Sequence, residues 1–371
     1  MIGSPTYPML RDSTLAAMLE ILEASGLPYE MNKAQNTILM GDTPSRIIFR
    51  ALEDFERLRG PNLAWFGVDE MTYTKEEAWL RLEGRLRDPK AKQLCGFGVW
   101  TPKGYDWVYK KFVHNPADGY ECVQAKPGEN RHLLDAVPDF YTRLERSYDD
   151  QFFRQEILGE YVNRAGRKVY SSFSRERHVT DLSLTPWAQL FWALDFNVDP
   201  MSSVVAQIVA REVRVLDEIV LRRATTQEAC ETFLERYPRH DAGIVVCGDA
   251  SGNHQQTTGA ADYEVVKKHF EAHSNMTVDF RVPKCNPPVR QRVNLVNATL
   301  RSASGVVGLF IDRKCKELIQ DLEEVTYKAD SYQIDKERDR MRTHLSDALG
   351  YLVWQELNTL ASIGEQGRRM A

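Results

Sequence analysis

The sequence predicts two consecutive α/β domains, and three observations support this prediction. With 371 residues, the chain is long enough for two ordinary domains that each bury a core. Short apolar segments that end in acidic or turn residues alternate with amphipathic helical patterns along the chain. A polar segment, Asn163 to Lys168, separates the two halves. We therefore expect domains over residues 1–165 and 166–371.

The composition excludes several other classes of protein. Apolar residues make up 43% of the chain and charged residues 27%, as in globular proteins. No apolar run approaches the roughly 18 residues of a membrane span, and the first residues lack a secretory signal pattern. The six cysteines are scattered without a CxxC pair, which argues against a zinc site and a disulfide framework and favours a reducing compartment. The formal net charge of −5 neither supports nor excludes nucleic-acid binding.

The first half alternates between expected helices and short strands. An amphipathic helix is expected from Asp12 to Ser25, where Gly26 ends it. Further helices are expected over 75–87 and 139–158. The expected strands are 36–40, 46–49, 63–68 and 94–100.

The second half begins with three consecutive strands rich in Val, Ile and Leu, expected over 191–196, 203–209 and 212–220. A helix over 225–237, with Thr225 or Thr226 as its N-cap, leads to a fourth strand over 243–247. Helices then follow over 261–272, 290–302, 314–324 and 343–357, with short strands over 277–282 and 308–311. Three strands, a helix, a strand and then helices is the order of a ribonuclease-H-like domain.

Three aspartates stand where α/β domains place catalytic groups. Asp195 follows the first of these strands, Asp249 follows the fourth, and Asp347 opens the last helix. If the two strands are neighbours, both carboxylates emerge at one edge of the sheet, and the helix can deliver the third. Three hard oxygen ligands suit Mg²⁺ or Mn²⁺ rather than zinc. Two such ions about 4 Å apart would activate a water and stabilise the leaving oxygen of a phosphodiester.

Each of these residues also has a purely structural interpretation. Asp249, in Gly-Asp-Ala-Ser-Gly, can be a turn residue, and Asp347 can cap a helix. His344, on the helix face of Asp347, can ligate a metal, move a proton or orient a water, or can be a plain capping or surface histidine. Asp199 is either a turn residue or a ligand of a second ion, and Asp312 is a similar outside candidate. The joint order of the three aspartates favours the catalytic interpretation.

Two groups of basic residues follow Asp249 in the sequence and can contact a phosphate backbone. Acidic residues are interleaved in the second group, which favours a solvated face for most of its members. We expect only a minority to contact DNA. The two groups are Arg281, Lys284, Arg290, Arg292 and Arg301, and Lys336, Arg338, Arg340 and Arg342.

The strand that ends at Val68 is followed by the acid pair Asp69-Glu70. In a P-loop ATPase such a strand places the Asp on Mg²⁺ and the Glu beside the attacking water. Thr101 follows the next strand, where a polar residue senses the γ-phosphate. However, the loop GxxxxGK[ST] is absent, and the dipeptide Gly-Lys occurs nowhere in the chain. We therefore expect no ATPase activity from this chain alone, and ATP binding only if the missing segment is supplied.

Taken together, these features resemble the large terminase subunit of tailed bacteriophages, which packages and cuts viral DNA. The three aspartates match the nuclease triad of that family, with His344 in its usual place. Five further segments carry the resemblance by their order in the chain: Pro5 to Leu15, Arg46 to Leu63, Trp100 to Trp107, Phe153 to Tyr161 and Val289 to Asn297.

The resemblance implies an incomplete RecA-like P-loop ATPase domain, beginning just past its phosphate loop, followed by a ribonuclease-H-like nuclease domain. It implies a metal-dependent endonuclease that cuts concatemeric viral DNA during genome packaging in the cytoplasm of a bacterial host. The implied partners are double-stranded DNA, the small terminase subunit and the portal protein, with homo-oligomerisation an open alternative. Two other interpretations remain: a translocation motor that needs an upstream phosphate-loop segment, and a non-catalytic prophage remnant.

Overall fold

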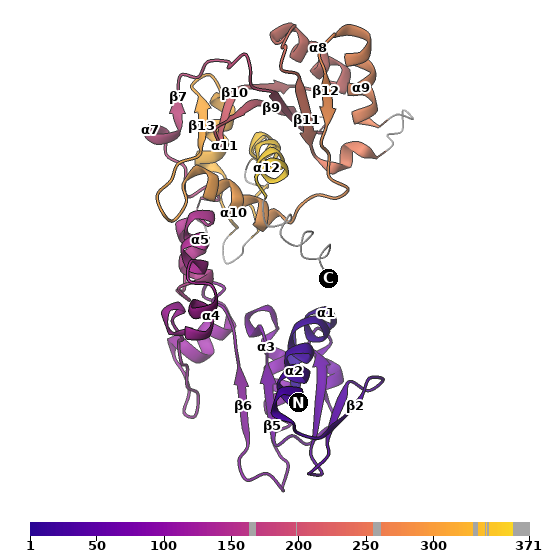
Figure 1. The fold of residues 1–371 in the computed structure, drawn as a ribbon, viewed down its shortest axis with the longest axis vertical. Helices are drawn as coiled ribbons and strands as arrows, with labels where there is room; N and C mark the ends of the chain where they lie inside the picture. Colours follow the sequence, from indigo (N-terminus) through magenta and orange to yellow (C-terminus); the bar gives the residue numbers. More distant parts are fainter. Residues whose placement is uncertain are drawn as a thin grey trace. The chain divides into compact units, whose positions relative to one another are not determined.

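The computed structural model describes residues 1–162, 168–197, 199–254, 261–328, 333–337, 339 and 341–358. Two compact units, each with its own sheet, divide the chain (Figure 1). Unit 1 comprises Met1–Lys126 and Leu158–Asn163, and unit 2 comprises Pro127–Ile157 and Arg164–Ala371. The predicted fold class, two consecutive α/β domains, is confirmed. Residues 163–167 of the predicted boundary segment lie outside the described residues, so the boundary at residue 165 stays a prediction.

The sheet of unit 2 has seven strands in the order β12-β11-β8-β9-β10-β13-β7. Strand β9 runs antiparallel to β8 and β10, and β11 lies parallel to β8 on its other side. This is the ribonuclease-H-like arrangement expected from the order of the elements. The strands are β7 (Val179–Thr180), β8 (Leu190–Asp195), β9 (Met201–Val209), β10 (Glu212–Leu221), β11 (Ile244–Gly248), β12 (Val278–Phe280) and β13 (Leu309–Asp312).

Helices cover both faces of this sheet. Side chains of α8 and α9 form the core on one face, and those of α10, α11 and α12 form the core on the other. Every residue of β8 is buried, because alternate side chains enter the two cores. The covering helices are α8 (Thr226–Arg236), α9 (Asp262–His273), α10 (Val289–Leu300), α11 (Lys316–Glu324) and α12 (His344–Leu357), and smaller ones are α4 (Arg131–Ala136), α5 (Phe140–Ser147), α6 (Asp150–Glu156), α7 (Arg175–His178), η5 (Pro127–Glu129) and η6 (Ala250–Asn253).

Helix α12 lies against the centre of the sheet and contacts β8, β9 and β11 (Figure 1). Its residues from Leu345 to Val353 are all buried. A helix that is apolar on every side belongs in the interior of a domain rather than on its surface. The packing of these residues therefore fixes where α12 lies on the sheet.

Unit 1 contains a six-stranded sheet in the order β2-β3-β4-β1-β5-β6, of which β4, β1, β5 and β6 are parallel. One face packs on α3 and η4, and the other packs on the helical segment that begins at Tyr7. The strands are β1 (Ile2–Ser4), β2 (Tyr29–Asn32), β3 (Thr37–Met40), β4 (Arg46–Ala51), β5 (Trp65–Val68) and β6 (Cys95–Gly98); the helices are α1 (Tyr7–Met9), η1 (Leu10–Leu15), α2 (Ala16–Ser25), η2 (Phe55–Leu58), η3 (Met71–Tyr73), α3 (Glu76–Glu83) and η4 (Tyr109–His114).

The beginning of unit 1 differs from the expectation. The first helical segment starts at Tyr7 rather than Asp12, because Thr6 caps it and the π-helical turn η1 continues into α2. Strand β1 was not expected, since three residues carry no readable periodicity. It forms because its backbone pairs with β4 and β5 at the centre of the sheet.

The single helix expected over 139–158 is two helices, α5 and α6. Between them, Tyr148 O accepts a hydrogen bond from Ala303 N at 2.7 Å, and Asp149 forms a bridge with Ser302. The side chain of Asp149 then caps α6 through Phe152 N. Tertiary pairing thus interrupts a segment whose local pattern is helical throughout.

Two further findings bear on the expected compartment. All six cysteines are free. Within the described ranges, no helix is both long and apolar enough to cross a membrane. The cytoplasmic location stays a prediction.

Candidate active site

Asp195 and Asp249 lie at the same edge of the sheet of unit 2. Strand β8 ends at Asp195, and Gly248 of the parallel strand β11 is the register partner of Leu194. The backbone of Asp249 continues this pairing, since its N–H donates to Leu194 O at 3.0 Å. The expectation that the two strands are neighbours is confirmed.

Gly248 allows this close approach of β11 to β8. Its φ is +141°, and a Cβ added there would lie 2.1 Å from the carbonyl oxygen of Leu194. Such a separation is impossible for a real side chain, so only glycine fits between the two strands. The residue directly before Asp249 therefore sets how near the two carboxylates come.

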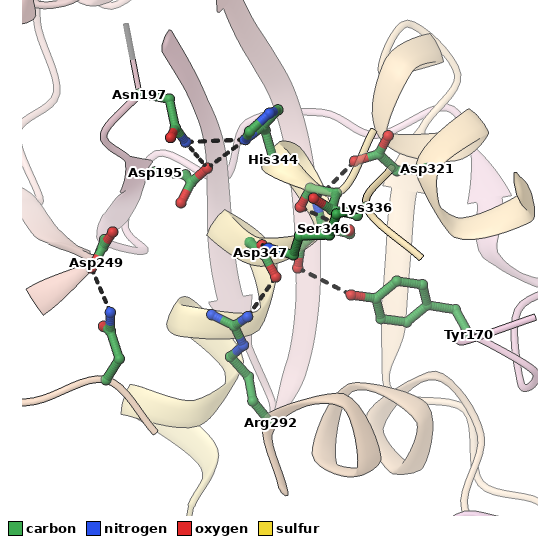
Figure 2. Close-up of polar contacts among 12 residues, drawn as sticks. Tyr170, Asp195, Asn197, Asp249, Arg292, Asp321, Lys336, His344, Ser346 and Asp347 are labelled. Atoms are coloured by element: carbon green, nitrogen blue, oxygen red, sulfur yellow. Dashed lines mark hydrogen bonds and ion pairs between the residues drawn. The ribbon is translucent and has the colours of Figure 1, made fainter. Parts of the chain in front are cut away.

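Helix α12 brings His344 and Asp347 to this edge. Nδ1 of His344 lies 3.0 Å from Oδ2 of Asp195 (Figure 2). Asp347 follows one turn later on the same helix face. The fold thus gathers all four predicted catalytic residues, Asp195, Asp249, Asp347 and His344, around one end of the sheet. Their catalytic role stays a prediction.

Asp195 is only 5% exposed and has two polar neighbours. Besides His344, Nδ2 of Asn197 donates to its Oδ2 at 2.5 Å. Burial raises the pKa of Asp195, the hydrogen bond with His344 lowers it, and the negative charges of Asp347 and Asp249 raise it. The three carboxylates are therefore close enough to interact, and a cation among them would be favoured.

Asp347 is equally buried, and both of its oxygens are in ion pairs. Oδ1 lies 2.5 Å from Nη2 of Arg292, and Oδ2 lies 2.9 Å from Nζ of Lys336 (Figure 2). Arg292 is 3% exposed, and its guanidinium lies 4.1 Å from the ring centroid of Tyr351. Gly350 leaves room for the Arg292 chain, because a Cβ there would lie 2.9 Å from Cδ of Arg292. The carboxylate of Asp347 and the guanidinium of Arg292 thus form a buried ion pair.

Asp249 is half-buried and also serves the turn that follows it. Its Oδ1 accepts from Ser251 N at 2.8 Å, which begins η6, and from Nδ2 of Asn286 at 2.6 Å. Asp249 therefore does have the structural role in a turn that its sequence suggested. It does not compete with a ligand role, because a carboxylate has about four lone-pair directions.

The chemistry of these residues fits a divalent cation. The available ligand atoms are hard oxygens, and Oγ of Ser202, the cross-strand partner of Asp195, is a buried oxygen that has no hydrogen-bond partner among the described residues. Nη1 of Arg292 also lacks a partner there, but as the N–H donor of a cation it suits an anion rather than a metal ion. However, in this part of the chain no three His, Cys, Asp or Glu side chains are already placed to hold a metal ion. The ion pairs of Asp347 are one physical reason for this.

Several residues around the carboxylates were not predicted as site residues. Asn197 and Asn286 are amides in loops, which the sequence pattern does not distinguish from ordinary turn residues. Arg292 and Lys336 were among the basic residues considered as candidates for phosphate contact, only a minority of which were expected to contact DNA, and not as partners of Asp347. One signal in the sequence could have indicated a buried role for Arg292: it lies among the apolar positions of the helix Val289–Leu300, where a charged residue needs a buried partner.

The outside candidate Asp199 lies in a bend, and Asp312 is the last residue of β13. Asp199 is exposed and lies 3.8 Å from Arg222 and 3.7 Å from Arg223. Asp312 accepts backbone N–H groups from Leu182 and Lys314. Among the basic residues, Arg281, Arg290 and Arg342 are in ion pairs with acidic side chains, and Arg338 and Arg340 lie outside the described residues.

In unit 1, the expected nucleotide residues lie at the ends of neighbouring parallel strands. Asp69 follows β5, and its Oδ2 accepts from Oγ1 of Thr14 at 2.6 Å. Glu70 has a left-handed backbone with φ 48°. The carbonyl of Thr101, beyond β6, accepts from Oγ1 of Thr72 at 3.1 Å. Their role in binding ATP or Mg²⁺ stays a prediction.

The fold defines the class of protein first. The large terminase of a thermophilic bacteriophage, solved in complex with ADP, superposes with a TM-score of 0.60 over 96% of this chain and 85% of that chain, at 17% identity. The complex of the same phage protein with ATP-γ-S gives a TM-score of 0.58 at the same coverage. The chain therefore has the fold of a large terminase.

One sequence relative points to the same class. Over 173 residues, the chain is 27% identical to the PBSX phage terminase large subunit of Bacillus subtilis strain 168. That match covers 41% of this chain and 40% of the relative, so less than half of either protein is matched. No family model matches the chain. The predicted resemblance to phage terminase large subunits is confirmed in sequence and in fold.

Proposed function

We propose that this chain is a divalent-metal-dependent endonuclease that cuts double-stranded, concatemeric viral DNA during genome packaging. One observation supports the proposal above the others: Asp195, Asp249 and Asp347 come from two strands and a helix to one end of a ribonuclease-H-like sheet. Burial and mutual repulsion make this group of carboxylates attractive to a cation.

The three aspartates would hold Mg²⁺ or Mn²⁺, which supplies a Lewis acid that activates water and stabilises the leaving oxygen. Two ions are the simplest arrangement for three carboxylates and a phosphodiester. When Nδ1–H of His344 donates to Asp195, the ring carries its lone pair on Nε2. His344 then acts as the general base that takes a proton from the attacking water.

The test is cleavage of supercoiled plasmid DNA in the presence of Mn²⁺. The wild-type chain should nick or linearise the plasmid, and a chelator should stop the reaction. Asp249→Ala should lower the rate at least 100-fold, which is the order of effect that follows removal of a group essential to the chemistry.

Asp241→Ala is the matched control. Asp241 belongs to the same unit, is 77% exposed and pairs only with the nearby Arg239 among the contacts seen. Its replacement should leave cleavage unchanged. Cleavage that survives Asp249→Ala, or that persists in the chelator, would contradict the assignment of the three aspartates.

A second candidate function is an ATP-driven DNA-translocation motor. It is favoured by Asp69 and Glu70 at the end of β5, and by the large terminase of the thermophilic phage, which has been solved with ADP and with ATP-γ-S. The given sequence contains no phosphate loop, so this activity requires that an upstream segment or a neighbouring subunit supply one. ATP turnover by the purified chain, abolished by Glu70→Ala, would show that the motor interpretation holds without such a partner.

The proposed partners follow from the same relationship. A terminase large subunit would act on DNA together with a small terminase subunit and a portal protein, with homo-oligomerisation as a further option. Co-purification of each partner with this chain tests these interactions one at a time. A chain that neither cleaves DNA nor turns over ATP would instead support the non-catalytic remnant.

A further inference from the structure

The first turn of α12 begins at a strained residue. Thr343, its N-cap, has φ 82° and is 2% exposed, and its side chain makes no capping hydrogen bond. A β-branched residue in the left-handed region is an outlier that persists only where the surroundings hold it. His344 and Asp347, the two predicted catalytic residues of the helix, follow within this turn.

Asp321 of α11 supplies the cap that Thr343 does not. Its carboxylate is 1% exposed, and Oδ2 accepts the backbone N–H of Ser346 at 3.2 Å (Figure 2). A buried negative charge at the N-terminus of a 14-residue helix also interacts favourably with the helix dipole. Burial raises the pKa of Asp321 to about 7, and the contacts with Ser346 and Arg342 oppose this rise.

Arg342, the residue directly before Thr343, also contacts α11. Its side chain is 14% exposed and lies 3.5 Å from Oδ1 of Asp321, 3.0 Å from Glu317 and 3.8 Å from Glu324. A further ion pair, at 3.5 Å, joins it to Asp339. Asp321 of α11 alone among these acidic residues contacts both sides of the strained position, through Arg342 before it and through the backbone of Ser346 after it.

We propose that Asp321, acting with Arg342, is a positioning residue that holds the first turn of α12 so that His344 and Asp347 face Asp195. This inference rests on the proposed endonuclease function. Asp321 contacts neither Asp195 nor Asp347 in any hydrogen bond or ion pair seen here, so its influence on the reaction passes through the backbone of this turn.

Two substitutions separate the parts of this role. Asp321→Asn keeps an oxygen that can accept from Ser346 but removes the charge that faces Arg342, whereas Asp321→Ala removes both. Misplacement of catalytic groups by about 1 Å can lower a rate about 100-fold. We expect kcat for plasmid cleavage to fall about 10-fold in Asp321→Asn and about 100-fold in Asp321→Ala, with KM for DNA unchanged within about twofold.

Glu324→Gln is the matched control. Glu324 lies on the same helix and faces the same Arg342, but its side chain is 52% exposed and it makes no contact with the backbone of α12 among the described interactions. It should keep wild-type kcat. A purely structural role of Asp321 would lower the melting temperature without changing kcat below it, and that outcome would overturn the proposal.

Hydrogen exchange of the peptide over residues 343–349 gives a readout that does not need activity. The amide of Ser346 should exchange at least about 10-fold faster in Asp321→Ala than in the wild type, because it loses a buried acceptor. Glu324→Gln should not change it. If the amide of Ser346 exchanges equally fast in Asp321→Ala and in the wild type, the positioning role is refuted. If exchange is faster in Asp321→Ala but the wild-type chain does not cleave DNA, only the proposed function is refuted.

Discussion

At the scale of single residues, the predicted metal ligands already have cationic or amide partners within the chain. Asp347 faces Arg292 and Lys336, and Asp195 faces His344 and Asn197. These partners compensate carboxylates that would otherwise be buried without a counter-charge. Binding of a metal ion would therefore exchange one set of partners for another.

Lys336 is the partner most easily displaced, because its side chain is 57% exposed while that of Arg292 is 4% exposed. Lys336→Gln removes a competing cation from Oδ2 of Asp347. We expect the affinity for Mn²⁺ to rise about two- to fivefold, the range that a partly exposed ion pair implies. Calorimetric titration with Mn²⁺ measures this change directly.

Lys328→Gln serves as the comparison, since Lys328 pairs with Glu337 rather than with a predicted ligand. Its affinity for Mn²⁺ should match that of the wild type. Weaker binding by Lys336→Gln would show that the lysine supports the metal site instead of competing with it.

The raised pKa of Asp321 predicts that the stability of the folded chain depends on pH. Its pKa is raised from 3.8 to about 7 in the folded chain, so between these values the folded state keeps a proton that the unfolded state releases. The contribution of this group to stability is therefore present at low pH and is lost as the pH rises through about 7.

Asparagine cannot ionise, so the unfolding free energy of Asp321→Asn relative to the wild type should rise between pH 5 and pH 8, by about 2 to 3 kcal/mol. Urea denaturation at several pH values checks this prediction. A difference that does not change with pH would mean that Asp321 keeps an ordinary pKa.

At the scale of elements, the pairing of β8 with β11 decides how close Asp195 and Asp249 come. A Cβ at position 248 would lie 2.1 Å from Leu194 O, so Gly248→Ala must push the strands apart. We expect a loss of more than about 2 kcal/mol in unfolding free energy and a strong loss of plasmid cleavage.

Gly305→Ala separates the clash from backbone strain. Gly305 also has a positive φ, of +88°, but a Cβ there meets no atom within 4 Å. It should cost only about 1 kcal/mol and leave cleavage intact. If both variants behave alike, the approach of the two strands is not what Gly248 provides.

Most elements of unit 2 could be predicted because their patterns are strong. The capping box of α8, from Thr225 to Glu228, and the continuous apolar run of β8 are local signals. The prediction of one helix across α5 and α6 was wrong. The backbone of Asp149 pairs with Ser302 instead of continuing the helix, and Ser302 is too far away in sequence for a local pattern to reveal this. The two-residue strand β7 forms only because its backbone pairs with β13, which the local sequence does not show.

At the scale of the whole molecule, the helices α4, α5 and α6 belong to unit 2. Glu156 lies 2.7 Å from Arg290 of α10, and α5 also contacts α10. A fragment that starts at residue 127 should therefore have a higher melting temperature, by at least about 4 °C, than one that starts at residue 166.

Thermal unfolding of the two fragments, followed by circular dichroism, tests the domain boundary at residue 165. Equal melting temperatures would support a nuclease domain over 166–371. A lower melting temperature of the shorter fragment would place the boundary before Pro127 instead.

The sequence by itself determined the fold class, the order of the strands and helices in unit 2, and the identity of the three aspartates and His344 as candidates. These follow from periodicity, capping and the position of acids at strand ends, all of which are local. Only the tertiary structure decided that His344 contacts Asp195, that Arg292 and Lys336 neutralise Asp347, and that Asp321 caps α12. Those contacts join residues from separate elements, and burial, which makes each of them strong, exists only once the chain has folded.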